Sequence, residues 1–151
     1  MKVVFFVHCF FPGHFYGTET YTLELAKHYQ SCGYQVTVVT AIFQGEPGGC
    51  ETISRYEYQG IPVVCIDKNM LPHTRVKETY YQPDMREVLE RVLRDLNPDI
   101  VHVTHLINHT AVLLEVTHSI RCTRFCIWTA STSKCVMPVR SEPKRCIWRS
   151  V

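Results

Sequence analysis

The first 41 residues contain a strand, a loop, a helix and a second strand in quick succession, and this succession constrains the fold most. Residues 2–8 form a continuous apolar run typical of a strand that is covered on both faces. The loop 10–17, FFPGHFYG, precedes a helical pattern that starts at Thr18, and the run 35–41, QVTVVTA, predicts another strand. Strands joined through a helix run parallel, so the sequence predicts a βαβ unit.

The helix of this unit is expected over residues 18–32, with Gly33 in the usual position after its end. Glu19 lies in the first turn, where the helix dipole favours an acid. The apolar residues that recur on one face predict which side chains the helix buries, and they are Tyr21, Leu25, Ala26 and Tyr29.

Strands continue to alternate with helices along the chain. The clearest element is a helix over 85–96, whose apolar residues follow the i, i+3, i+4, i+7 pattern without a miss. Such alternation predicts an α/β fold with a Rossmann-like, doubly wound parallel sheet. The other expected elements are strands at 51–59, 61–66, 99–104 and 125–128, a helix from an Asn108 cap through Val116, and an irregular stretch at 67–81.

The C-terminal part of the sequence differs from the rest in charge and pattern. Residues 119–151 carry seven basic side chains and one acidic one, so they are +6, whereas the first 118 residues are −4. Neither helical nor strand periodicity persists beyond residue 129. We therefore expect a Rossmann-like domain over 1–128 and an irregular tail over 129–151. We hypothesise that the tail is translated out of frame.

Composition excludes several classes of protein. No apolar run reaches the roughly 18 residues that span a bilayer. The net charge of +2 does not favour a nucleic-acid binder. The N-terminal apolar run lacks a cleavage site for a secretory signal, so we expect a cytoplasmic protein whose cysteines remain thiols. Metal-binding spacings such as C-x₂-C are missing, so no metal site and no cofactor is expected.

Ligands of open parallel sheets bind outside the carboxyl ends of the strands. The loops expected there are 8–18, 41–49 and 104–110. The first contains Gly17 at the mouth of a helix, where backbone amides and the helix dipole favour an anion. Neither G-x-G-x-x-G nor the P-loop motif occurs, which argues against a dinucleotide enzyme or a nucleotide hydrolase.

Two segments resemble family 4 (group 1) glycosyltransferases. The first is the region 3–40, with matches at Phe11-Pro12-Gly13, Gly17-Thr18-Glu19, Leu23, Leu25-Ala26, Gly33 and Val36-Thr37-Val38-Val39-Thr40. The second is NPDIVHV at 97–103, followed by His105-Leu106. Together these segments frame residues 1–118, in the order and spacing of the family.

The resemblance implies the acceptor-side domain of a two-domain GT-B enzyme. Such an enzyme moves a sugar from a nucleotide-diphosphate donor to a glycan or lipid-linked acceptor, with retained anomeric configuration. We also expect location at the cytoplasmic face of the membrane, with peripheral membrane association, and no nucleic-acid partner. The residues expected to face the donor diphosphate are Gly13, Tyr16, Gly17 and Thr18. Those expected on the acceptor side are His102, His105 and His109, and no catalytic residue is assigned.

The sequence departs from the family pattern in three places. Tyr16 stands where the family usually has a first glycine, and the stretch 128–132 lacks the histidine found in many members. A second, donor-binding domain is missing from the 151 residues, so we expect a truncated and inactive fragment. A non-catalytic Rossmann-like binding or remnant domain remains the alternative.

Overall fold

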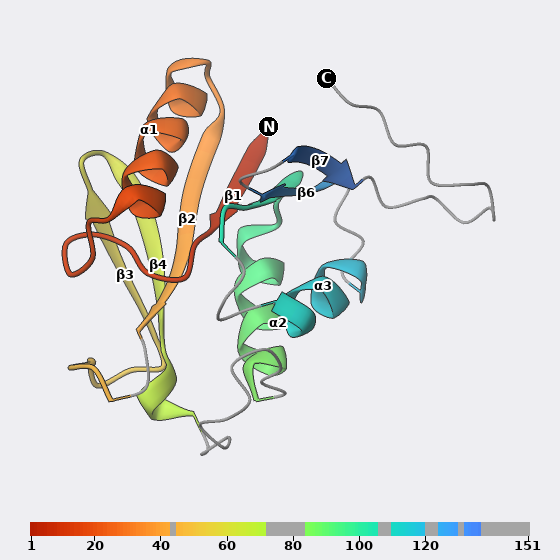
Figure 1. Ribbon diagram of the computed structural model, residues 1–151. Coiled ribbons are helices and arrows are strands. Elements are labelled where there is room, and N and C mark those ends of the chain that lie inside the picture. The colour runs from red at the N-terminus through yellow and green to blue at the C-terminus, as the bar shows by residue number, and fades with distance from the viewer. Residues whose placement is uncertain (43–44, 72–83, 106–109, 120–123, 130–131, 137–151) are drawn as a thin grey trace.

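The computed structural model describes residues 1–42, 45–71, 84–105, 110–119, 124–129 and 132–136, and at 110–111 and in the last two ranges it describes the backbone alone (Figure 1). Strands and helices alternate, as the sequence predicted. The elements are β1 (Lys2–Phe6), α1 (Gly17–Ser31), β2 (Gln35–Ile42), β3 (Ile53–Tyr58), β4 (Ile61–Asp67), the 3₁₀ helix η1 (Lys68–Met70), α2 (Met85–Leu96), β5 (Ile100–Val103), α3 (Thr110–Ser119), β6 (Arg124–Thr129) and β7 (Thr132–Val136).

The strands form one sheet in the order β3-β4-β2-β1-β5-β6-β7. Its central five strands, β4 to β6, all pair parallel, whereas β3 and β7 are antiparallel edge strands. From β1 the chain moves outward to β2 and β4, then returns to β5 on the other side of β1. The topology therefore reverses between β1 and β5, which is where a doubly wound sheet binds its ligand. The predicted α/β fold is confirmed.

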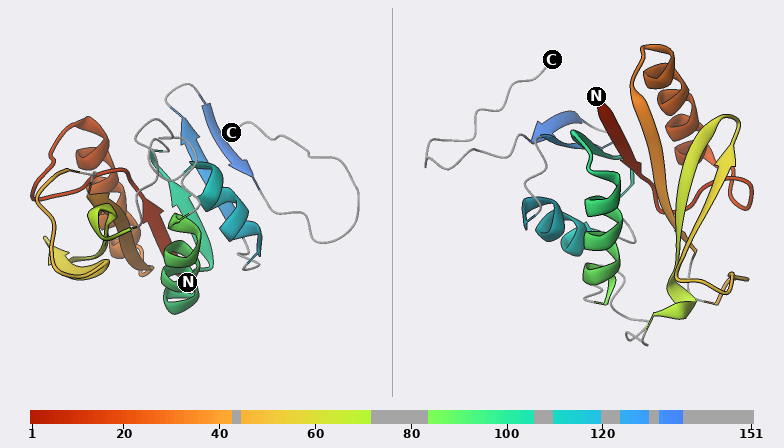
Figure 2. Two further views of the ribbon diagram at one scale, coloured as in Figure 1. Left: turned by 90° about the horizontal axis from the view of Figure 1, so that it is seen from below. Right: turned by 180° about the vertical axis from the view of Figure 1, so that it is seen from behind.

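Helices cover both faces of the sheet (Figures 1 and 2). α1 packs on one face, where its Leu23 and Ala26 join strand residues such as Phe5 and Val38. α2 and α3 pack on the other face around Phe6. Because consecutive side chains of a strand point to opposite faces, a strand with both faces covered has to be apolar throughout. This explains the unbroken apolar run of β1.

Backbone turns occur where residues tolerate a left-handed conformation. Gly33, after α1, has φ of 84°. Gln59 and Gly60 have φ of 49° and 80° between β3 and β4, which matches the right-handed twist of a two-residue hairpin. Asn97 ends α2 with φ of 45°, and its amide donates to the carbonyl of Leu93. These turns set the lengths of the elements on either side.

The buried face of α1 differs from the predicted one. Only Ala26 of the four predicted residues is buried, and Tyr21 is exposed. The face that meets the sheet is polar at its N-terminal end and apolar farther on, and it consists of Glu19, Thr22, Leu23 and Ala26. Polar residues lie there because the first turn of α1 reaches beyond the apolar core, to the carboxyl ends of the strands.

The region beyond residue 128 contains one element that periodicity did not predict. β7, at 132–136, pairs antiparallel with β6, because a hairpin partner needs only main-chain hydrogen bonds and no regular apolar pattern. The remaining residues of the predicted tail, 137–151, lie outside the described residues, as do Asn108 and most of the stretch 67–81.

Candidate functional site

The loops after β1 and β5 meet at the reversal of the sheet topology. β1 and β5 pair directly, with Phe6 opposite Val103. The amide of Thr104 donates to the carbonyl of Phe6 at 2.9 Å, which holds the two chain segments together one residue farther on. Two of the three predicted ligand-binding loops, those starting at His8 and at Thr104, are therefore neighbours.

His8, His105 and Glu19 form a cluster at this point. The rings of His8 and His105 have centroids 4.2 Å apart. Glu19, from the first turn of α1, is 1% exposed, and its Oε1 lies 3.4 Å from Nε2 of His8. Burial lowers the pKa of His8, the charges of His105 and His14 lower it further, and the carboxylate of Glu19 opposes them. The pKa of His8 therefore depends on Glu19 in α1, on His14 in the loop after β1 and on His105 in the loop after β5.

Two threonines fix the start of α1 to the sheet. The hydroxyl of Thr22 lies 2.7 Å from the carbonyl oxygen of Thr18 and 2.9 Å from the hydroxyl of Thr104. The hydroxyl of Thr104 is in turn 3.1 Å from the carbonyl oxygen of Phe6. Both threonines are buried. This chain of polar contacts places the first turn of α1 over the carboxyl ends of β1 and β5.

The N-terminus of α1 presents its amides without a side-chain cap. Tyr16 is the N-cap residue and makes no capping hydrogen bond, and the first helical bond runs from the amide of Thr20 to its carbonyl. The amides of Gly17, Thr18 and Glu19 precede that bond, so helix geometry leaves them without an intrahelical acceptor. Of the residues predicted to face a diphosphate, Tyr16, Gly17 and Thr18 therefore lie together at this helix end.

Gly13 and Gly17 are not required by the fold of the chain itself. Neither has a positive φ, and a Cβ atom built on either one meets no heavy atom within 4 Å. Both residues are exposed. A side chain would therefore fit at either position without contact to the rest of the described chain.

The predicted acceptor-side histidines do not lie together. His105 stacks on His8, whereas His102 lies within β5, with its ring centroid 5.0 Å from that of Phe5. Burial lowers the pKa of His102 to about 4, so this imidazole is neutral at pH 7. His109 lies outside the described residues. His102 is thus a residue of the sheet interior, one strand position away from the loop.

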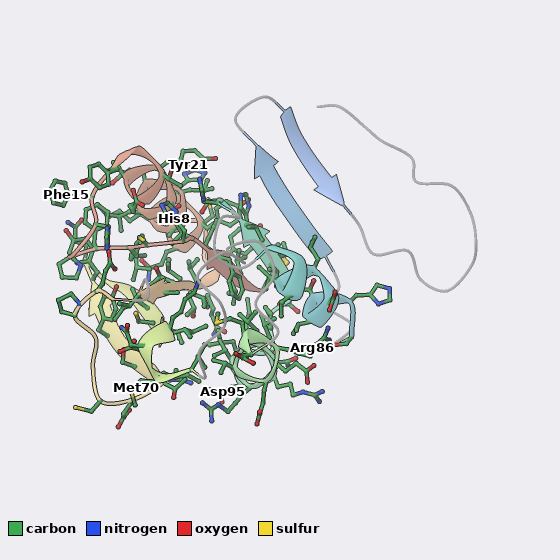
Figure 3. All side chains as sticks on the ribbon, turned by 60° about the horizontal axis from the view of Figure 1, so that its bottom comes forward. His8, Phe15, Tyr21, Met70, Arg86 and Asp95 are labelled. Atoms are coloured by element: carbon green, nitrogen blue, oxygen red, sulfur yellow. The ribbon has the colours of Figure 1, made fainter. Side chains whose placement is uncertain are left out.

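A pocket of about 540 Å³ lies between the loop after β1 and the strands β2, β4 and β3. The loop after β1 covers it, and the carboxyl ends of β2 and β4 and the start of β3 form its base. Figure 3 shows the surrounding side chains, with His8 lying beside α1 and Phe15 projecting from the loop at the edge of the molecule. The lining residues are Phe10, Phe11, Pro12, Gly13, His14, Thr40, Ala41, Ile42, Glu46, Pro47, Ser54, Tyr56 and Cys65.

Sequence analysis missed Glu19 as a partner of His8 and missed the pocket residues of β3 and β4. Glu19 was expected only to interact favourably with the helix dipole in the first turn, and no pairing with His8 was predicted. Ser54, Tyr56 and Cys65 carry no motif, because only the pairing of β3 and β4 with β2 places them at the base of the pocket.

Comparison with known families agrees with this geometry. A family model described as a glycosyl transferase 4-like domain matches residues 16–140, which is most of the chain. The chain belongs to the glycosyl transferase 4-like family. The match starts at the helix mouth and includes α1, the whole sheet except β1, and the loop that begins at Thr104. It confirms the resemblance to family 4 glycosyltransferases. A search of curated proteins finds no match.

Two further features of this glycosyltransferase domain concern its described residues only. None of its described helices combines the length and the apolar character that crossing a bilayer requires. In the same part of the chain, no group of three or more His, Cys, Asp or Glu side chains is placed to hold a metal ion. Cys9, Cys32, Cys50 and Cys65 are free thiols.

Proposed function

We propose that the chain is the acceptor-side domain of a retaining glycosyltransferase whose donor is a nucleotide-diphosphate sugar. Family membership supports the transferase class. The observation that carries the donor is an uncapped helix N-terminus with the exposed Gly17 in its first turn, at the reversal of the sheet. Amides at a helix N-terminus bind phosphate because their hydrogens and the helix dipole both favour negative charge.

Sugar transfer needs such a site on the leaving-group side. The bond between the anomeric carbon and the diphosphate oxygen breaks, and the diphosphate departs with the electron pair. A new bond forms between that carbon and an acceptor oxygen, whose proton is released. Amides fixed before the reaction stabilise the growing charge without having to reorganise. The threonine contacts between α1 and β5 supply that rigidity.

UDP and GDP test the diphosphate site. We expect each to bind the 151-residue chain weakly and to shift the amide NMR signals of residues 13–19. Gly17→Ala should weaken this binding about tenfold with no loss of stability, because the added methyl group meets only the ligand. Gly49→Ala is the matched control, since its Cβ has ordinary space and it lies outside the loop after β1. Equal affinities of the two variants would contradict the proposal.

We also propose that this chain alone does not transfer sugar. A GT-B site lies between two Rossmann-like domains, and the 151 residues form one of them. Incubation with UDP-glucose or GDP-mannose should therefore release no sugar to water or to an acceptor. If the chain is instead a non-catalytic binding domain, sugar transfer should stay absent even when a second, donor-binding domain is added. Addition of a donor-binding GT-B domain as a separate chain distinguishes the two.

The proposal places the protein in the cytoplasm, at the membrane when its acceptor is linked to lipid. Free thiols, two of them buried, support a reducing compartment. Phe15 and Tyr16 support a membrane contact, because they are 66% and 72% exposed and stack on each other at the tip of the loop. Aromatic side chains of this kind favour the headgroup region of a bilayer. Sedimentation with phosphatidylglycerol vesicles, compared between the parent chain and Tyr16→Ser, tests this contact.

A further inference from the structure

A row of three small polar residues forms the base of the pocket. Thr40 of β2 is paired with Cys65 of β4, and Cys65 is paired with Ser54 of β3. All three line the pocket. Burial raises the pKa of the Cys65 thiol to about 11, so it stays protonated at neutral pH. The base of the pocket is therefore polar but uncharged.

Thr40 lacks an internal partner for its hydroxyl. Its side chain is 2% exposed, and its Oγ1 makes no hydrogen bond to any residue that the structure describes. A buried hydroxyl without a partner costs about 1–3 kcal/mol. Since Thr40 lines the pocket, a ligand that enters can supply the missing hydrogen bond.

Aromatic side chains form one wall of the same pocket. Phe10, Phe11 and Tyr56 all line it. The hydroxyl of Tyr56 donates to the carbonyl of Phe11, and the ring of Phe11 stacks on Tyr58 at 4.7 Å with the two planes 8° apart. These contacts hold the loop after β1 against the β3–β4 hairpin, so the wall is apolar and fixed in place.

The charge on the pocket excludes an anionic occupant. The Nε2 atom of His14 lies 3.4 Å from a carboxylate oxygen of Glu46, and both residues line the pocket. No lysine or arginine is among the described lining residues, and Lys68, which follows β4, is not part of the lining. A phosphorylated ligand would lack a lysine or arginine partner among the described lining residues and would meet the carboxylate of Glu46.

We infer that this pocket binds an uncharged pyranose ring of the sugar acceptor. Such a ring has hydroxyl groups for Thr40, Ser54 and Glu46, and it has a face of C–H groups that packs on an aromatic wall. The pocket volume is within the roughly 300–1,000 Å³ typical of small-molecule sites. The inference rests on the proposed transferase function, and it moves the acceptor away from His102 to the ends of β2 and β4.

Titration of the isotope-labelled 151-residue chain tests the inference. The neutral probes are the methyl α-glycosides of glucose, mannose, galactose and N-acetylglucosamine, and the anionic probes are glucose 6-phosphate and inorganic phosphate. At least one neutral glycoside should shift the amide signals of residues 10, 11, 40–42 and 54, which do not overlap with residues 13–19. Thr40→Val should weaken its binding about fivefold to tenfold, because it removes one hydrogen bond at nearly constant volume.

Thr37→Val is the matched control, since Thr37 lies on the same strand but does not line the pocket. It should leave glycoside binding unchanged. Equal loss in the two variants, tighter binding of glucose 6-phosphate than of any neutral glycoside, or no shift of the lining residues by any neutral glycoside would overturn the inference. UDP binding at residues 13–19 is read in the same spectra, so failure of the diphosphate site is distinguished from failure of the pocket.

Discussion

The imidazole ring of His8, just beyond β1, stacks on that of His105, just beyond β5, with centroids 4.2 Å apart. The buried carboxylate of Glu19 also contacts His8, with its Oε1 atom 3.4 Å from Nε2 of the imidazole. One buried carboxylate and two imidazole rings therefore lie together at the reversal of the sheet, beside the N-terminus of α1. The protonation of His8 reports directly on this arrangement.

Substitution of the two groups beside His8 should move its pKa in opposite directions. The carboxylate of Glu19 raises the pKa of His8. Glu19→Gln removes this negative charge, so the pKa of His8 should fall further below its ordinary value. His105→Phe keeps a stacking ring but removes a positive charge, so the pKa should rise. NMR titration of the His8 ring protons measures both changes. Shifts of the same sign in the two variants would contradict this arrangement.

The threonine contact between α1 and β5 should contribute measurably to stability. Thr22→Val and Thr104→Val each leave a buried polar partner unsatisfied, so each should lower the free energy of unfolding by about 1–2 kcal/mol. The double variant should lose less than the sum, because both substitutions break the same contact. Urea unfolding measures the three values. Strict additivity would show that the two hydroxyl groups do not interact.

His102 should make the domain acid-sensitive. Its pKa is 6.5 when unfolded and about 4 in the fold, so the unfolded state takes up a proton first as the pH falls. The free energy of unfolding should therefore be highest above pH 6.5, where His102 is neutral in both states. It should fall by about 3 kcal/mol in total as the pH is lowered from 6.5 to 4. His102→Phe keeps the packing on Phe5 and should flatten this part of the stability curve.

The control for the acid effect is His118→Phe, which alters an exposed histidine of α3. It should leave the pH dependence of the melting temperature between pH 6.5 and 4 unchanged. A parent-like curve for His102→Phe would show that His102 is protonated in the folded protein over this range.

Gly48 should not tolerate a side chain. A Cβ atom there would lie 1.9 Å from Oδ2 of Asp67, a buried carboxylate that accepts hydrogen bonds from the amides of Gly49 and Asn69. Gly48→Ala must displace that carboxylate, so it should lower the free energy of unfolding by about 1–3 kcal/mol. Gly17→Ala meets no atom of the chain and should change it by less than about 0.5 kcal/mol. Similar losses in both would contradict the geometry.

The buried face of α2 shows how far local pattern reaches. Its apolar residues recur at helical spacing, and the structure buries five of them, from Met85 to Leu93. The pattern of α1 was weaker: Ala26 is buried and Leu25 and Tyr29 pack partly buried against the core, but Tyr21 is exposed. Glu19 and Thr22 are also buried, since their polar partners His8 and Thr104 lie just beyond the carboxyl ends of β1 and β5. No single stretch of sequence contains that information.

The sequence by itself determined the order of strands and helices, the parallel βαβ unit and the glycine loop at its carboxyl edge. These features follow from periodicity and turn residues, which are properties of neighbours along the chain. Only the tertiary structure decided that His8 meets His105, that Glu19 is buried, and that Thr40, Cys65 and Ser54 form one row. Strand order and register bring these residues together, and both are set by the packing of segments that are distant in sequence.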